Sequence, residues 1–189
     1  MSLVQSVPVS FESEAVTFSG NVAEVSGGAV FVTGTGIGPK FANVTFVGNS
    51  AQTGGGVHAT GSGNELTKDV SGNTVEHPMT FDGCSFLGNY AFATGGAVDS
   101  ASGKDVFVNT IFKGNEARVG GALRLAGMAS VDNCSFVENI SELGGGPAVS
   151  NIGYMSSVTN NSFYGNVFNC EPKTFLYFNM VSLFPTLAL

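Results

Sequence analysis

The sequence predicts an all-β protein, a single-stranded right-handed parallel β-helix of about six rungs, and three observations predict it. A Phe-x-x-Asn motif recurs at intervals of 28, 40, 26, 24 and 27 residues. A glycine pair follows five of the six motifs, and short runs rich in β-formers lie between motifs and glycines. Self-similarity at such a period is the mark of a solenoid, in which each repeat covers the core of its neighbour. The segments between the glycines show no 3.6-residue apolar period, which argues against helical repeats.

The six Phe-x-x-Asn motifs are expected to supply two internal columns. They are Phe18–Asn21, Phe46–Asn49, Phe86–Asn89, Phe112–Asn115, Phe136–Asn139 and Phe163–Asn166. Alternation along a strand places each phenylalanine and the residue two positions before it on one face, which we assign to the interior. Stacked strands lie about 4.8 Å apart, so the rings are expected to stack on one another. Amide side chains in the same position of successive rungs can hydrogen-bond along the axis, which predicts a column of asparagines.

The glycine pairs mark a corner of the coil. They are Gly27–Gly28, Gly55–Gly56, Gly95–Gly96, Gly120–Gly121 and Gly145–Gly146. Glycine supplies positive φ and lets neighbouring backbones approach closely, so each pair predicts a turn before the next strand. Pro147 follows the last pair, and proline cannot donate to a strand pair, so we expect an irregular corner there.

The chain is expected to form one domain over residues 1–189. Residues 1–15 are assigned to an N-terminal cap or assembly segment, and residues 16–166 to the rungs. The single long interval of 40 residues predicts an inserted loop at 60–79. Residues 167–189 are apolar and predict a C-terminal cap or assembly segment, because a solenoid must cover the strand edges at its ends.

Composition narrows the possible partners. The net charge is −7, and the seven Lys and Arg residues form no cluster, so no nucleic-acid partner is predicted. The apolar C-terminal stretch is shorter than the roughly 20 residues that span a bilayer, so no membrane span is predicted. The three cysteines, Cys84, Cys134 and Cys170, give neither a disulfide framework nor metal-ligand spacing. No metal and no cofactor are predicted.

One cluster of polar residues is a candidate ligand face. Counted from the glycine pairs, His58, Asp99 and Arg124 take about the same position in consecutive rungs. They are expected to stack on an outer face, where a histidine between charges can act as acid or base. No nucleophile or second carboxylate joins them, and cross-strand charge pairing explains them without catalysis. The other acidic residues are spread along the chain, so we predict that the protein is not an enzyme.

Three asparagines are candidate glycosylation sites. Asn43, Asn133 and Asn160 each lie in an Asn-x-Ser/Thr sequence, three residues before a motif phenylalanine. Strand alternation points this position outward, so the three sites are expected to form a stripe. Asn139 also lies in such a sequence but belongs to the internal column. The alternative is chance, since the repeat is rich in Asn, Ser and Thr.

The repeat resembles that of the chlamydial polymorphic outer-membrane proteins, in which Phe-x-x-Asn precedes Gly-Gly-Ala and Ile, Leu or Val. The matching segments are FSGN…GGAV at 18–30, FVGN…GGGV at 46–57, FLGN…GGAV at 86–98, FKGN…GGAL at 112–123 and FVEN…GGGP at 136–147. The resemblance covers roughly residues 15–166. It implies a right-handed parallel β-helix displayed at the cell surface, with a role in adhesion or display and no catalytic residues.

These observations predict a non-enzymatic structural or adhesive module that lies outside the cell or at its surface. The ends of the coil are expected to mediate self-association, which would make the chain a head-to-tail fibre subunit. A carbohydrate or a cell-surface protein is the expected partner. The alternative function is a carbohydrate-active enzyme or carbohydrate-binding module that uses the face around His58, Asp99 and Arg124. The first fourteen residues show no signal peptide, which predicts a processed chain, a fragment or a cytosolic protein.

Overall fold

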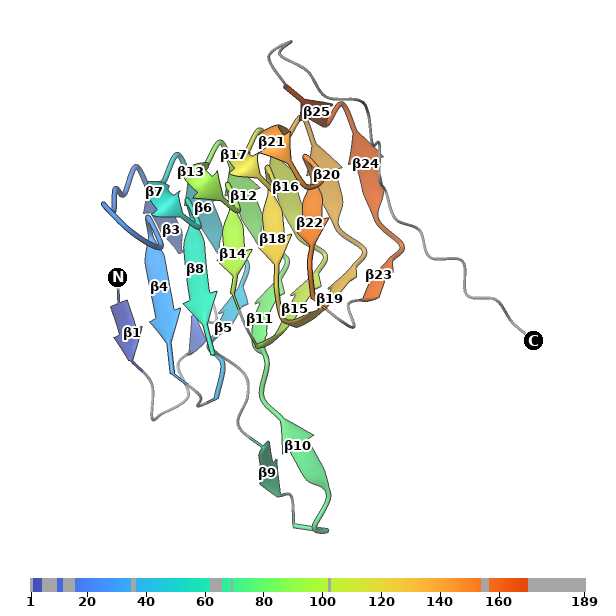
Figure 1. Ribbon diagram of the computed structural model, residues 1–189. Coiled ribbons are helices and arrows are strands. Elements are labelled where there is room, and N and C mark those ends of the chain that lie inside the picture. The colour runs from blue at the N-terminus through green and yellow to red at the C-terminus, as the bar shows by residue number, and fades with distance from the viewer. Residues whose placement is uncertain are drawn as a thin grey trace, which may run out of the picture.

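The computed structural model describes residues 2–4, 10–11, 16–34, 37–61, 66–68, 70–101, 103–153 and 157–169. These residues form strands and turns, with no helix among them. Parallel strands stack along one axis and build a β-solenoid whose sheets run along its length (Figure 1). The predicted all-β parallel solenoid is therefore confirmed.

After each glycine corner the chain first forms a strand of sheet 1 and then a strand of sheet 2. Sheet 1 consists of β1 (Ser2–Val4), β4 (Val30–Thr33), β8 (Val57–Thr60), β14 (Val98–Ser100), β18 (Leu123–Leu125) and β22 (Val149–Asn151). Sheet 2 consists of β2 (Ser10–Phe11), β5 (Lys40–Ala42), β11 (Met79–Asp82), β15 (Lys104–Val108), β19 (Met128–Asp132) and β23 (Ser157–Thr159). Every neighbouring pair in these sheets is parallel, as the coil requires.

The other two long sheets carry the motif. Sheet 3 consists of β3 (Thr17–Ser19), β6 (Thr45–Val47), β12 (Ser85–Leu87), β16 (Ile111–Lys113), β20 (Ser135–Val137) and β24 (Ser162–Tyr164). Sheet 4 consists of β7 (Ser50–Thr53), β13 (Tyr90–Thr94), β17 (Glu116–Val119), β21 (Ile140–Gly144) and β25 (Val167–Phe168). The chain visits sheets 1 to 4 in order and completes about five turns, close to the six rungs expected. Strand β25 extends the stack beyond residue 166, and β1 and β2 extend it into residues 1–15.

The motif phenylalanines form one stacked column along sheet 3. From Phe18 to Phe163 the ring centroids of successive members lie 5.2, 4.5, 5.1, 4.8 and 5.1 Å apart. A second column, Phe41, Phe81 and Phe107 of sheet 2, meets the first edge to face. Both geometries are favourable for aromatic pairs. The last ring, Phe163, is 47% exposed, because no described rung covers it.

The motif asparagines form a hydrogen-bonded ladder beside the rings. In the four middle members, Nδ2 donates to the Oδ1 of the next rung and to the phenylalanine carbonyl of the preceding one; for Asn89 these distances are 3.0 and 2.9 Å. The Asn89 Oδ1 accepts from both the backbone and the side chain of Asn49. All four bonds of a buried amide are thus made, which is what burial of a polar group demands. The expectation of an internal position is wrong for the first member, Asn21, which is exposed, and Asn166 is only half-buried.

The corner glycines have two separate roles. Strand register aligns Gly54, not Gly55, with Gly27, because Val57 pairs with Val30. The predicted pair Gly55–Gly56 is therefore wrong by one residue, and Gly54–Gly55 is the pair. The first glycine of each pair has positive φ, which is 60° at Gly54. A Cβ on the second, Gly55, would collide with the Gly96 carbonyl of the next rung.

The fifth corner holds one extra residue. Val119 pairs with Gly144 and Leu123 with Val149, so the fifth turn has one more residue between the two sheets than the fourth turn. The carbonyl of Pro147 accepts from the Ala122 N–H. In earlier turns the N–H groups of the glycine corner donate to carbonyls of the glycine corner in the following turn. No glycine pair follows the sixth motif, so an N–H at the position of Pro147 would have no such corner to donate to. Proline is tolerated at this corner for that reason.

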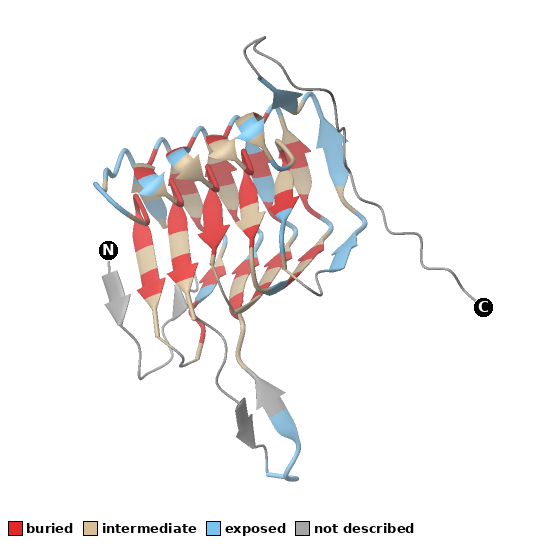
Figure 2. Cartoon of the chain, viewed as in Figure 1, coloured by how far each residue is buried: buried red, intermediate tan, exposed pale blue. Residues whose placement is uncertain are grey.

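The inserted segment leaves the coil without disturbing it. Between β8 and β11 the chain forms an antiparallel hairpin of β9 (Leu66–Lys68) and β10 (Thr74–Glu76), which projects from the stack (Figure 1). Strand β11 then pairs in register with β5 before the insertion and β15 after it. Buried residues occupy the central turns, and exposed residues gather in the last one (Figure 2).

Candidate functional site

The cluster at His58, Asp99 and Arg124 lies in register on β8, β14 and β18, as the sequence suggested. Arg124 Nη1 donates to Asp99 Oδ1 at 2.9 Å, and His58 Nδ1 lies 3.7 Å from Asp99 Oδ2. The hydroxyl of Thr94 also donates to Oδ2. The expectation of an exposed face is wrong, because Asp99 is only 1% exposed. The corner between sheets 4 and 1 brings Thr94 over this carboxylate, so its oxygens are already engaged within the chain.

Burial sets the protonation of His58. Desolvation lowers its pKa below the ordinary value; the Asp99 carboxylate opposes this shift, and Arg124 adds to it. The ring stacks on Phe31, with centroids 5.6 Å apart, and its Nδ1 is buried without a hydrogen-bond partner. The imidazole is therefore neutral at pH 7. The cluster is arranged as a structural charge pair with a histidine packed beside it.

A second line of asparagines runs along the outside, at the corner between sheets 2 and 3. Asn43, Asn109, Asn133 and Asn160 are exposed and have φ of 56°, 51°, 51° and 53°. Asparagine is one of the few residues besides glycine that adopts this left-handed conformation readily. Asn109 was missed as a corner residue because no sequon marks it. Its position three residues before Phe112 is the signal that identifies it.

Two of the three candidate glycosylation sites use the nitrogen that would carry a glycan. Asn133 Nδ2 donates to Asn109 Oδ1 at 2.7 Å, and Asn160 Nδ2 donates to Asp132 Oδ1 at 2.9 Å. Asn43 lies in the same exposed column. Asn139, by contrast, is fully buried in the internal ladder.

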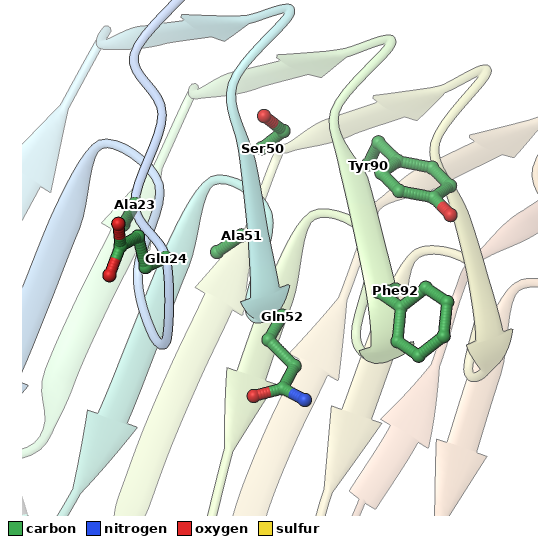
Figure 3. Close-up of a pocket in the computed structure, with 7 residues that line it drawn as sticks. All are labelled: Ala23, Glu24, Ser50, Ala51, Gln52, Tyr90 and Phe92. Atoms are coloured by element: carbon green, nitrogen blue, oxygen red, sulfur yellow. The ribbon is translucent and has the colours of Figure 1, made fainter.

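A shallow hollow of about 350 Å³ lies on the outer surface of sheet 4 (Figure 3). It is lined by Ala23, Glu24, Ser50, Ala51, Gln52, Tyr90 and Phe92. The aromatic side chains of Tyr90 and Phe92 are 41% and 54% exposed. They leave β13 on the same face, two residues apart, as strand alternation requires. Sequence reasoning missed this hollow because neither residue belongs to the repeated motif.

Two features hold Phe92 in place. Arg118 of the next turn lies over its ring, with Cζ 5.4 Å from the centroid, in a cation–π contact. The register of β13 shifts between Ala91 and Thr94 against both neighbouring strands. Such a bulge re-aims the side chains beside it and recurs near binding sites.

Other reactive groups among the described residues are inert or dispersed. Burial raises the pKa of the Cys84 and Cys134 thiols to about 11, so both are protonated and act as small apolar residues. Cys170 lies outside the described residues. Over the same described ranges, no group of three His, Cys, Asp or Glu side chains is placed to hold a metal ion. Nor does any helix in them have the length and apolarity to cross a membrane.

The fold defines the chain as a parallel β-solenoid protein with a regular internal core and a varied outer surface. A family model described as the Chlamydia polymorphic membrane protein (Chlamydia_PMP) repeat matches residues 15–33. This segment contains the first motif and the first glycine corner, so the repeat resemblance is shown there. No curated protein and no solved structure matches the chain.

Proposed function

We propose that the protein is a structural and adhesive module that is displayed at a cell surface and has no catalytic role. The repeat match at 15–33 and the solenoid fold support a surface-associated β-helix. Stacked rings and amide ladders make a stiff rod, since every turn is bonded to the next one. A rod of this kind holds its outer side chains at fixed positions, which suits recognition of a partner.

The observation that carries this proposal is the exposed pair Tyr90 and Phe92 beside Arg118 on sheet 4. Tyrosine and arginine are the residue types that most often dominate binding energy at protein surfaces, and exposed aromatic groups mark interaction sites. All three residues project from adjacent strands of one sheet. The partner is a component of another cell's surface, and the contact is made through sheet 4.

Binding of the labelled full chain to cultured epithelial cells, measured by flow cytometry, tests the proposal. We expect saturable binding that the double variant Tyr90→Ala, Phe92→Ala largely loses. Ile111→Ala is the matched control, because Ile111 is 44% exposed in a middle turn of sheet 3, away from sheet 4 and from the last turn. Saturable binding that the double variant retains in full would contradict the role of sheet 4, and absence of binding by the wild type would contradict adhesion.

We further propose that the molecules associate end to end. The asparagine ladder has a direction, since each amide-to-amide bond runs from Nδ2 of one turn to Oδ1 of the next, from Asn21 to Asn166. Asn21 therefore lies at the accepting end of the ladder and Asn166 at the donating end. Phe163, Tyr164 and Phe168 are 47%, 73% and 48% exposed in the last turn. A second copy that continues the ladder would cover them. Of the predicted C-terminal assembly segment at 167–189, residues 170–189 lie outside the described residues.

Sedimentation velocity over a range of concentrations tests end-to-end association. Phe163→Lys places a charge on the exposed ring position and is expected to shift the protein toward monomer. Tyr90→Ala serves as the control, because it lies on the side of the rod. Equal association of both variants would exclude this end as the interface.

For the three sequons we propose that Asn43 accepts a glycan more readily than Asn133 or Asn160 when the chain passes through a glycosylating compartment. The Nδ2 groups of Asn133 and Asn160 each donate a hydrogen bond within the chain, which holds the amide against its neighbour and competes with modification. Mass spectrometry of the chain secreted from eukaryotic cells measures the occupancy. Higher occupancy at Asn133 or Asn160 than at Asn43 would refute this order.

A further inference from the structure

The hollow on sheet 4 is lined by two aromatic residues on one side and by small and polar residues on the other. Tyr90 and Phe92 form the aromatic side, and the lining residues Ala23, Ser50 and Ala51 of the two preceding turns are small. Glu24 and Gln52, which carry a carboxylate and an amide, also line the hollow and lie on the two turns that precede Tyr90 and Phe92 (Figure 3). Arg118 does not line the hollow, because it lies on β17, the strand on the other side of β13. The hollow therefore combines one aromatic side with several hydrogen-bonding groups.

The solenoid does not require aromatic residues at these positions. Ser50, Tyr90, Glu116 and Ile140 occupy equivalent positions in successive strands of sheet 4, so a serine or a glutamate fits as well as a tyrosine. The inward residue between Tyr90 and Phe92 is Ala91, which is fully buried and matches Ala51 and Ala117. Exposing two large rings to water is unfavourable relative to covering them. The packing of the coil therefore does not account for the two exposed rings.

We propose that the hollow binds a neutral pyranose ring at the end of a glycan, and this proposal rests on the adhesive function above, for which it names the ligand class. A pyranose has an apolar face of C–H groups that can pack flat on an aromatic ring, whose π face is negative. Its rim of hydroxyl groups both donates and accepts hydrogen bonds. Glu24, Gln52 and Ser50 supply acceptors and donors on the other side of the hollow.

Charge and size favour this class over other sugars. Glu24 is acidic, no Lys or Arg lines the hollow, and the chain carries a net charge of −7. An anionic sugar such as a sialic or uronic acid would meet repulsion there. A volume of about 350 Å³ lies at the small end of the range for ligand sites, which suits one or two sugar rings. A site so open to solvent binds weakly, so many copies of the protein on one surface would act together.

Saturation-transfer NMR on the full chain tests this site directly. The probes are methyl β-D-galactopyranoside, methyl β-D-glucopyranoside and methyl α-D-mannopyranoside, with N-acetylneuraminic acid as the anionic comparison. We expect transfer to the C–H protons of one face of at least one neutral pyranoside, and little transfer to the acid. Phe92→Ala should weaken binding about tenfold, which corresponds to a loss of about 1.4 kcal/mol of binding free energy.

Two further variants separate stacking from simple contact and from loss of fold. Phe92→Leu keeps an apolar side chain without a π face and should weaken binding nearly as much as Phe92→Ala. Ile111→Ala removes an exposed apolar side chain outside the hollow and should leave binding unchanged. Unchanged circular dichroism in every variant verifies the fold. Binding that survives Phe92→Ala, or transfer to none of the neutral probes, overturns the glycan proposal.

The same variants distinguish this proposal from the adhesive function on which it rests. If cells bind the wild type but not the Tyr90→Ala, Phe92→Ala variant, while no neutral pyranoside binds, the adhesive function stands and the ligand is a protein. If pyranosides bind but cells do not, the site is a glycan site and adhesion is wrong. Enzymatic removal of cell-surface glycans should abolish cell binding when both proposals hold.

Discussion

The inner and outer columns of this solenoid obey different rules. Inside, the same residue type recurs in every turn of the solenoid. Phenylalanine recurs in sheet 3, and asparagine recurs at the corner between sheets 3 and 4. Outside, a single column of sheet 1 reads Phe31, His58, Asp99, Arg124 and Ser150. An inner side chain stacks on a copy of itself, so a change in one turn affects two neighbours. An outer side chain is free to differ, and this is where recognition can arise.

The largest effect is expected inside. Asn115→Leu should lower the free energy of unfolding by about 3 kcal/mol, because it removes four buried hydrogen bonds of the Asn115 side chain. Two come from the backbone N–H and Nδ2 of Asn89, and two go to the Phe86 carbonyl and the Oδ1 of Asn139. Urea unfolding followed by circular dichroism measures this loss. A loss as small as that of an exposed substitution would show that the ladder is dispensable and that the rings alone hold the turns in register.

The buried charge pair should come second, because it lies outside the coil but away from water. Asp99→Ala removes the partner of Arg124 and of Thr94, and we expect a loss of about 2 kcal/mol. The control is Lys113→Ala, which breaks the exposed pair with Glu138 and should cost less than about 0.5 kcal/mol. Equal losses in the two variants would mean that burial of Asp99 adds nothing.

A smaller effect is expected at the outer corner, where the backbone rather than the side chain is decisive. Asn109→Ala should lose about 1 kcal/mol, since alanine tolerates a φ of 51° poorly. Asn109→Gly should be close to neutral, because glycine suits this conformation and loses only two exposed hydrogen bonds, those with Asp82 and Asn133. Thermal unfolding of the two variants measures the difference. If alanine is tolerated as well as glycine, the side-chain hydrogen bonds of the outer asparagines, and not the backbone conformation, stabilise this corner.

The smallest effect is a pH dependence that comes from His58. Its pKa is lower in the folded chain than in the unfolded one, so the folded state binds fewer protons. Stability from this group is present above about pH 6.5 and falls as the pH drops toward the folded pKa. His58→Gln should flatten the slope of unfolding free energy against pH between about 7 and 5.5. A steeper slope in the variant would mean that Asp99 raises the pKa more than burial lowers it.

Much of the fold followed from the repeat. Phe46, Phe86 and Phe112 could be placed in one interior column because the motif and strand alternation are regular. The predicted glycine pair was wrong by one residue at Gly54–Gly56. Three consecutive glycines allow two alignments in the sequence, and the hydrogen bonds between strands select the one with Gly54 opposite Gly27. The end members, Phe163 and Asn21, were predicted as interior, because a repeat pattern does not reveal which turn is last.

The surface was less predictable. The register of His58, Asp99 and Arg124 could be counted from the glycines, but the burial of Asp99 depends on how the sheet 4 corner folds over sheet 1. Tyr90 and Phe92 carry no motif, and their exposure depends on a bulge and on small neighbours in two other turns. Such features arise from contacts between turns, which a single sequence does not encode at any fixed spacing.

The hairpin between β8 and β11 shows how freely one junction of this molecule accepts extra chain. Phe81 still aligns with Phe41 on one side and Phe107 on the other, although the insertion lies between their turns. Closing a longer loop adds little entropy cost, because that cost grows only with the logarithm of length. A foreign epitope or a fluorescent tag grafted at this junction should therefore be presented away from the rod, with the stacked turns left intact.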